Sequence, residues 1–174
     1  MVILLVALSL SMDAFSLAII YGMFNFSKKD EITLSIIVGL YHFFMPLLGN
    51  YLGNIIFDII NIKMNIVVGI IFILIGIEMI IDTLKKEEHH SINNIIQMLI
   101  FGLAVSIDSF SVGLGFNYLT HKYILSSLIF SLFSFSMTYI GLNFGKRIGT
   151  KIGSLSTIIG SIILIILGLI YLFK

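Results

Sequence analysis

The chain has 174 residues, of which 59% are apolar and 11% are charged, and its mean hydropathy is +1.13. A water-soluble domain of this length has no core large enough to bury so much apolar surface, so the composition predicts an integral membrane protein. The net charge of +1 comes from short clusters between apolar runs, which argues against nucleic-acid binding. The sequence has no cysteine, which excludes disulfides, thiolate metal sites and cysteine nucleophiles.

Six apolar segments are long enough to cross a bilayer as α-helices, which takes about 20 residues each. They are predicted at roughly residues 2–25, 32–57, 65–84, 92–118, 122–145 and 153–173. The first segment has no basic leader and contains Asp13, which predicts a transmembrane helix and not a cleaved signal peptide. The polar breaks are too short to fold separately, so residues 1–174 are predicted to form one all-α transmembrane domain.

Basic residues are distributed unequally between the two sides of the predicted bundle. Seven follow the first, third and fifth segments: Lys28, Lys29, Lys85, Lys86, Lys146, Arg147 and Lys151. Three lie on the other side: Lys63, Lys122 and Lys174. Because basic loops are retained in the cytoplasm, the sequence predicts that both termini lie outside.

A six-residue motif in the first segment recurs in the fourth. Ser11-Met12-Asp13-Ala14-Phe15-Ser16 reappears 95 residues later as Ser106-Ile107-Asp108-Ser109-Phe110-Ser111, with four of six positions identical. At an offset of 92, Met45 matches Met137, Gly49 matches Gly141, Gly53 matches Gly145 and Gly76 matches Gly168. Three helices per repeat predict two inverted copies, at about residues 1–84 and 92–174, as is typical of transporters. The alternative is chance matching within the small alphabet of apolar helices.

Asp13 and Asp108 are the residues in the motif that carry charge. A carboxylate near the middle of a membrane helix costs about 2.5–3.5 kcal/mol, so such acids are usually functional. No lysine or arginine lies at a comparable depth, and inverted helices bring equivalent residues toward the centre. We therefore expect a site that binds a small cation or protons. The alternative is a pair of structural acids bonded to neighbouring helices.

Five further polar residues are candidate ligands for such a cation: Ser16, Ser111, His42, Asn50 and Asn143. The two serines stand three residues after an aspartate on the same helix face, and hydroxyl and amide oxygens suit hard divalent ions. Pro46 frees the carbonyl of His42, which makes this segment a candidate ligand or hinge. The alternatives are serines bonded to their own backbone, a packing kink at the histidine and asparagines bonded between helices.

Two other groups have more ordinary interpretations. Ser134 and Thr138 share a stripe with Gly141 and Gly145, which is typical of a small and polar packing face. Glu78 and Asp82 lie one turn apart near the end of the third segment. They are interpreted either as an entrance for the cation or as a solvated helix end.

Three segments of the chain resemble the MntP family of bacterial manganese efflux pumps. They are Ser11 to Phe15, Met45 to Gly49 and Ser106 to Asp108, and the likeness extends over essentially the whole length, including the Gly145-Lys146-Arg147-Ile148-Gly149 step. The resemblance implies export of Mn²⁺ from the cytoplasm across the plasma membrane. It also implies that Asp13 and Asp108 are the functional acids.

The sequence has no Walker loop and no soluble domain, so it predicts no ATP hydrolysis. Export must then use an ion gradient, and our hypothesis is proton antiport in which the aspartate pair binds either one Mn²⁺ or two protons. Mn²⁺ is the substrate in this scheme, with no cofactor and no enzymatic activity. Three alternatives are export of another small cation or an amino acid, a non-transporting membrane scaffold, and an intramembrane enzyme with an aspartyl dyad.

Overall fold

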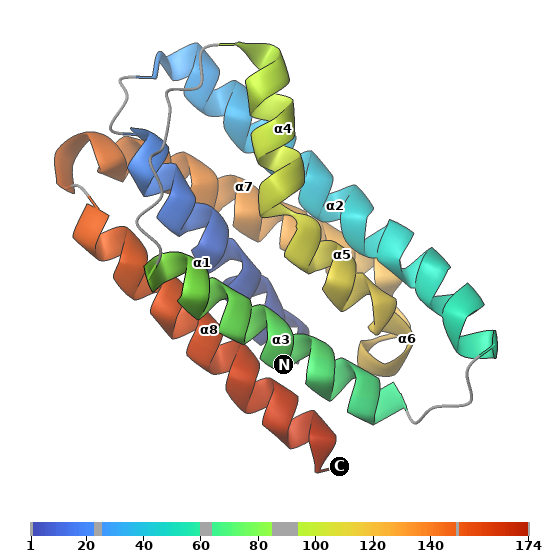
Figure 1. Cartoon of the computed structure of the whole chain (residues 1–174). Helices are drawn as coiled ribbons and strands as arrows, with labels where there is room; N and C mark the ends of the chain where they lie inside the picture. The colour runs from blue at the N-terminus through green and yellow to red at the C-terminus, as the bar shows by residue number, and fades with distance from the viewer. Residues whose placement is uncertain (1, 23–25, 60–63, 85–93, 149, 174) are drawn as a thin grey trace.

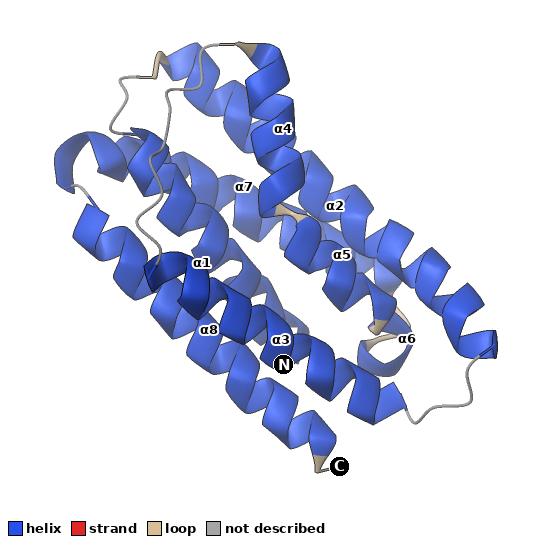
Figure 2. Ribbon diagram, in the orientation of Figure 1, coloured by secondary structure: helices blue, strands red, loops and turns tan. Residues whose placement is uncertain are grey.

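The structure is a computed structural model that describes residues 2–22, 26–59, 64–84, 94–148 and 150–173. All of its regular secondary structure within these ranges is helical (Figure 2), as the composition predicts. The elements are α1 (Val2–Gly22), α2 (Lys28–Ile59), α3 (Met64–Leu84), α4 (Ile95–Val105), α5 (Ile107–Leu114), α6 (Phe116–Leu119), α7 (Tyr123–Ile148) and α8 (Thr150–Leu172). Both termini lie at the same end of the bundle as α6 (Figure 1).

The prediction of one continuous helix over residues 92–118 is wrong, because the chain breaks at Ser106 and again at Gly115. The backbone N–H of Ser106 donates to the carbonyl of Leu103 at 3.2 Å, three residues back, which interrupts the regular α-helical pattern. The Ser106 hydroxyl donates to the Gly102 carbonyl at 2.6 Å. These bonds satisfy the backbone at the break, which is what lets a helix bend inside an apolar environment.

The helices pack in pairs that are distant in sequence. α1 packs on α7, α2 packs on α5, and α3 packs on α8, while α2 also contacts α7 and α1 contacts α8. Glycines make the close approaches: a side chain on Gly49 would collide with the carbonyl oxygen of Phe110 on α5, and one on Gly141 with that of Phe15 on α1. Small residues bring membrane helices close enough for backbone contact.

Two apolar clusters fill the bundle. One contains Leu10 of α1, Val112 of α5 and Phe130 of α7, and the other contains Ala14 of α1 and Val105 of α4. The short segments between them, residues 11–13 on α1 and 106–111 on α4 and α5, carry most of the repeated motif. The motif therefore lies in a polar layer between two apolar clusters.

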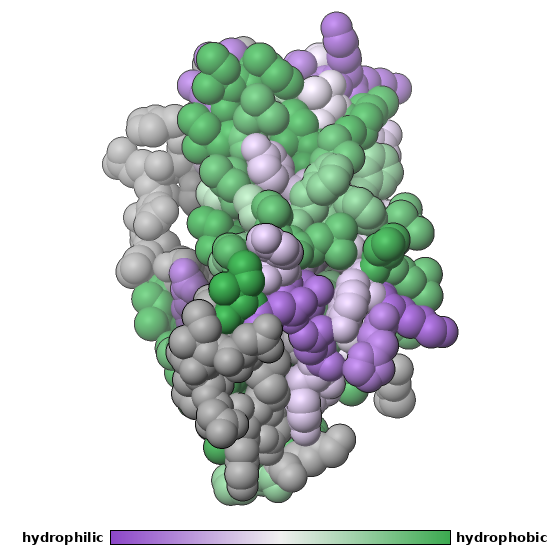
Figure 3. Space-filling view, turned by 90° about the vertical axis from the view of Figure 1, so that its right-hand side faces the viewer, coloured by the Kyte–Doolittle hydropathy of each residue, from purple (hydrophilic) through white to green (hydrophobic). Residues whose placement is uncertain are grey.

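The outward faces of the helices are apolar as well. Leu40, Phe44, Leu48 and Ile55 follow one another along α2 and are all exposed. Figure 3 shows hydrophobic residues over much of the visible face, between hydrophilic groups near its top and lower down. Among the described residues, four stretches are long and apolar enough to cross a membrane: Val2–Gly22, Lys28–Ile55, Ile95–Leu114 and Tyr123–Gly145. Ile66–Glu78 and Ser161–Leu172 are shorter apolar stretches. The chain is a membrane protein.

The glycine contacts predict a specific loss of stability. Gly49→Ala places a methyl group against the backbone of α5, and overpacking of this kind costs about 1–3 kcal/mol. Thermal unfolding of the purified protein in detergent should show a lower midpoint for Gly49→Ala. The neighbouring Leu48 is exposed, so Leu48→Ala should unfold like the native chain. Equal midpoints for all three proteins would contradict this contact.

Candidate cation site

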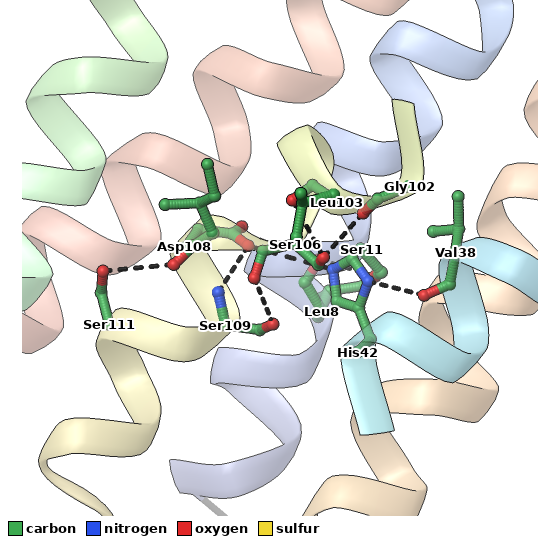
Figure 4. Close-up of polar contacts among 11 residues, drawn as sticks. Leu8, Ser11, Val38, His42, Gly102, Leu103, Ser106, Asp108, Ser109 and Ser111 are labelled. Atoms are coloured by element: carbon green, nitrogen blue, oxygen red, sulfur yellow. Dashed lines mark hydrogen bonds and ion pairs between the residues drawn. The ribbon is translucent and has the colours of Figure 1, made fainter. Parts of the chain in front are cut away.

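His42 lies on α2 and its side chain is completely buried. Its Nδ1 lies 3.0 Å from the carbonyl oxygen of Val38, one turn back (Figure 4). A carbonyl can only accept a hydrogen bond, so this contact assigns the proton of a neutral imidazole to Nδ1. The lone pair is then on Nε2, which has no hydrogen-bond partner.

Asp108 faces this nitrogen from the first turn of α5. Its Oδ1 lies 4.0 Å from His42 Nε2 and accepts a 2.5 Å hydrogen bond from the backbone N–H of Ser109. Its Oδ2 is buried and has no hydrogen-bond partner. The helix break at Ser106 is two residues away, and it sets the direction in which the first turn of α5 presents the carboxylate.

The remaining acids act on Asp108 through their charges. Asp13 on α1 and Glu78 on α3 both lie close enough for their charges to interact with its carboxyl group. Asp13 is partly buried, while Glu78 is exposed. The two aspartates of the repeated motif therefore lie within electrostatic range of each other. Asp82 lies outside the residues whose side chains are described.

The other predicted ligands are arranged less uniformly around this pair. Asn50 lies eight residues after His42 on α2, and its Oδ1 is buried without a hydrogen-bond partner. Ser16 is buried on α1. Ser111 donates its hydroxyl to the carbonyl of Ile107 at 3.2 Å, and Asn143 is exposed and donates to the carbonyl of Tyr139 at 2.8 Å. Both bonds lie within the residue's own helix, which is the alternative interpretation of Ser111, whereas for Asn143 the alternative was a bond between helices.

Two residues near the pair were not among the predicted ligands. Ser11 and Ser106 occupy equivalent places in the repeated motif and are both fully buried. Their hydroxyls donate to the carbonyls of Leu8 at 2.8 Å and Gly102 at 2.6 Å (Figure 4). Their repetition beside the aspartates was the signal that could have identified them.

The geometry at His42 and Asp108 is chemically incomplete. A lone pair and a carboxylate oxygen are both acceptors, so neither can donate a hydrogen bond to the other. A divalent ion bound about 2.1 Å from each atom would span their 4.0 Å separation. Among the described residues, no third His, Asp or Glu completes a metal cluster with them. Further ligands would therefore be neutral oxygens, water or a repositioned Asp13.

This incompleteness predicts the effect of Asp108→Asn on stability. The amide group can donate a hydrogen bond toward the unpaired His42 Nε2, and it removes a buried charge. We expect the variant to unfold at an equal or higher temperature in metal-free detergent, with a gain of up to about 1 kcal/mol. Asp30→Asn is the comparison variant, because Asp30 is paired with Ser27 in the first turn of α2 and its replacement should bring no gain in stability. A clear drop in stability would mean that the carboxylate is a structural acid.

Known proteins resemble this chain along almost its whole length. A family described as "Putative manganese efflux pump" matches residues 25–172. A protein from Geobacillus thermodenitrificans named "Putative manganese efflux pump MntP" is 34% identical over 171 residues, which cover 98% of this chain and 93% of that protein. A protein of the same name from Bacillus pumilus is 32% identical over 170 residues, covering 97% of this chain and 92% of the relative. No solved structure gives a significant match. The chain belongs to the MntP family of manganese efflux pumps.

Proposed function

We propose that this chain exports Mn²⁺ from the cytoplasm across the bacterial plasma membrane, through a site formed by Asp108, His42 and Asp13. Family membership supports the substrate. The observation that carries the site is the pair of acceptors, His42 Nε2 and Asp108 Oδ1, 4.0 Å apart between two apolar clusters. A cation is the ligand that both acceptors can share.

The ligand types agree with this substrate. Carboxylates and neutral oxygens suit Mn²⁺, and imidazole binds divalent first-row metals. Without cysteine, the chain offers no thiolate to favour copper(I) or zinc. Asp13 brings a second negative charge near Asp108, so the site has the charge to balance a divalent ion.

We further propose that the bundle consists of six membrane-spanning units in two inverted repeats, with both termini outside. Helix contacts support this arrangement because they recur at the sequence offsets of the repeat. Gly49 approaches the carbonyl of Phe110. Their counterparts in the other repeat make the same contact: Gly141, 92 residues after Gly49, approaches the carbonyl of Phe15, 95 residues before Phe110. The next contact follows the same two offsets: Gly53 approaches the carbonyl of Leu114, and its counterpart Gly145 approaches the carbonyl of Ile19.

A second set of contacts, between the third helices of the two repeats, follows the same rule. Gly168 meets the carbonyl of Gly69, and Gly76 meets the carbonyl of Ser161. The two contacts are equivalent, because Gly168 lies 92 residues after Gly76 and Ser161 lies 92 residues after Gly69. Two halves that make equivalent contacts can interchange their conformations. This supports alternating access, with the break at Ser106 as a hinge.

Export of Mn²⁺ from a negative interior opposes two charges at about 2.3 kcal/mol each per 100 mV, or about 4.6 kcal/mol. We propose that protons entering the cell supply this free energy. The aspartate pair would bind either one Mn²⁺ or two protons, and both loads neutralise it. The empty pair carries uncompensated charge, and moving it through apolar surroundings is costly.

The first test is intracellular manganese in a manganese-sensitive bacterial strain. The native chain should lower it, whereas Asp13→Asn/Asp108→Asn and His42→Ala should not, at matched membrane levels. His121→Ala changes an exposed histidine between α6 and α7 and should export normally. Full export by the aspartate double variant would rule out this site.

The second test addresses coupling in vesicles that contain the purified protein. Two protons crossing one pH unit release about 2.7 kcal/mol, because one unit corresponds to 1.36 kcal/mol per proton. An acidic vesicle interior should therefore drive Mn²⁺ accumulation up to about 100-fold. A protonophore should abolish the accumulation. If Mn²⁺ enters the vesicles and reaches equal concentrations on both sides whatever the pH gradient, proton antiport is excluded.

A further inference from the structure

Three hydroxyl groups on α7 differ from the other buried hydroxyls of the bundle. Ser127, Ser134 and Thr138 are completely buried, and none of their hydroxyls has a hydrogen-bond partner. Six other buried serines donate to a backbone carbonyl three or four residues back: Ser9, Ser11, Ser35, Ser106, Ser109 and Ser161. Bonding to the preceding turn is the usual way in which a hydroxyl is satisfied inside an apolar helix. We call Ser127, Ser134 and Thr138 the hydroxyl row.

The hydroxyl row lies on one face of α7. Its members are seven and four residues apart, a spacing that returns to the same side of a helix. Thr138 precedes Gly141 by three residues, and Gly141 is where α7 approaches the backbone of α1. The hydroxyl row therefore faces the bundle interior on the side of α1, which Figure 1 shows running alongside α7.

The contacts between α1 and α7 place the row along the bundle. Gly141 meets Phe15 and Ala18, and Gly145 meets Ile19 and Gly22, so the two helices run in the same direction. Extending this register puts Thr138 at about the level of Asp13 and Ser127 near the start of α1, eleven residues or about 16 Å away. The row leads from the polar layer to the end of the bundle where both termini lie.

The surroundings of this segment are mostly apolar. Val6 and Leu10 of α1 and Phe130 of α7 belong to the same buried cluster, and Ser9 of α1 is bonded to its own helix. The hydroxyl row therefore offers polar groups to an ion that leaves Asp13 toward this end. Unpaired hydroxyl oxygens offer neutral ligands, or partners for the ion's own water, at successive turns of α7.

We propose that the hydroxyl row lines the outward part of the cation path and holds a partly hydrated divalent cation between the aspartate layer and the outer surface. This inference rests on the proposed function and names residues that complete it. Neutral hydroxyls suit this position because a path must bind an ion strongly enough to admit it and weakly enough to release it. A carboxylate here would retain the ion.

The natural absence of cysteine makes the path directly testable. Ser127→Cys, Ser134→Cys and Thr138→Cys each introduce the chain's one thiol, in intact cells treated with a membrane-impermeant thiol reagent. We expect labelling from outside at all three positions, slowed by external Mn²⁺. Lys122→Cys is the exposed positive control, and Ser161→Cys, a buried position on α8 bonded to its own helix, should not react. If neither Ser134→Cys nor Thr138→Cys reacts with the reagent added outside, the proposal is wrong.

A transport measurement in vesicles separates this proposal from the proposed function. Ser134→Ala/Thr138→Val removes two hydroxyls at nearly constant volume, and we expect about tenfold slower Mn²⁺ transport with equilibrium Mn²⁺ binding unchanged within about twofold. Ser161→Ala, which removes a buried hydroxyl on α8 outside the row, should transport normally. If the native chain moves no Mn²⁺, the proposed function fails. If it does and the double variant matches Ser161→Ala, only the path fails.

Discussion

The interaction on which the rest of the structure depends is the approach of two hydrogen-bond acceptors, His42 Nε2 and Asp108 Oδ1, inside an apolar bundle. Each would be solvated in water, whereas here Oδ1 accepts one hydrogen bond, from the Ser109 backbone, and Nε2 has no donor. Leaving such groups buried costs free energy, so a sequence that keeps them gains something other than stability. The clusters around Leu10 and Ala14 place this layer in apolar surroundings, where electrostatic interactions are stronger than in water.

The helix break is a consequence of the same requirement. A straight fourth helix would carry Asp108 on a continuous α-helical surface, whereas the turn at Ser106 places it in the first turn of a new helix. The Ser109 N–H, free of helical partners at that position, donates to the carboxylate. The equivalent residue in the first repeat, Ser11, bonds to Leu8 within an unbroken α1. The same motif thus has two backbone forms in a single molecule.

The sequence predicted the membrane class and the all-helical fold, because these follow from hydropathy and length. It did not predict the break at Ser106. Serine is compatible with a continuous helix, as Ser11 demonstrates, and only tertiary packing distinguishes the two. His42 was predicted through its carbonyl, which Pro46 frees, whereas in the structure the ring itself faces the carboxylate. Ser134 and Thr138 were interpreted as a packing face because the sequence does not reveal whether a hydroxyl is bonded to its own helix.

The two repeats also differ in the strength of the groups they supply. His42 and Ser134 are equivalent positions at the offset of 92, and one carries an imidazole while the other carries a hydroxyl. Two equally strong centres would each trap a divalent ion, and movement between them would require both to release it. In the mechanism we propose, a nitrogen ligand beside one aspartate forms the one strong centre, and the hydroxyl row forms a weakly binding route away from it. On this proposal, the departure from repeat symmetry is what permits release.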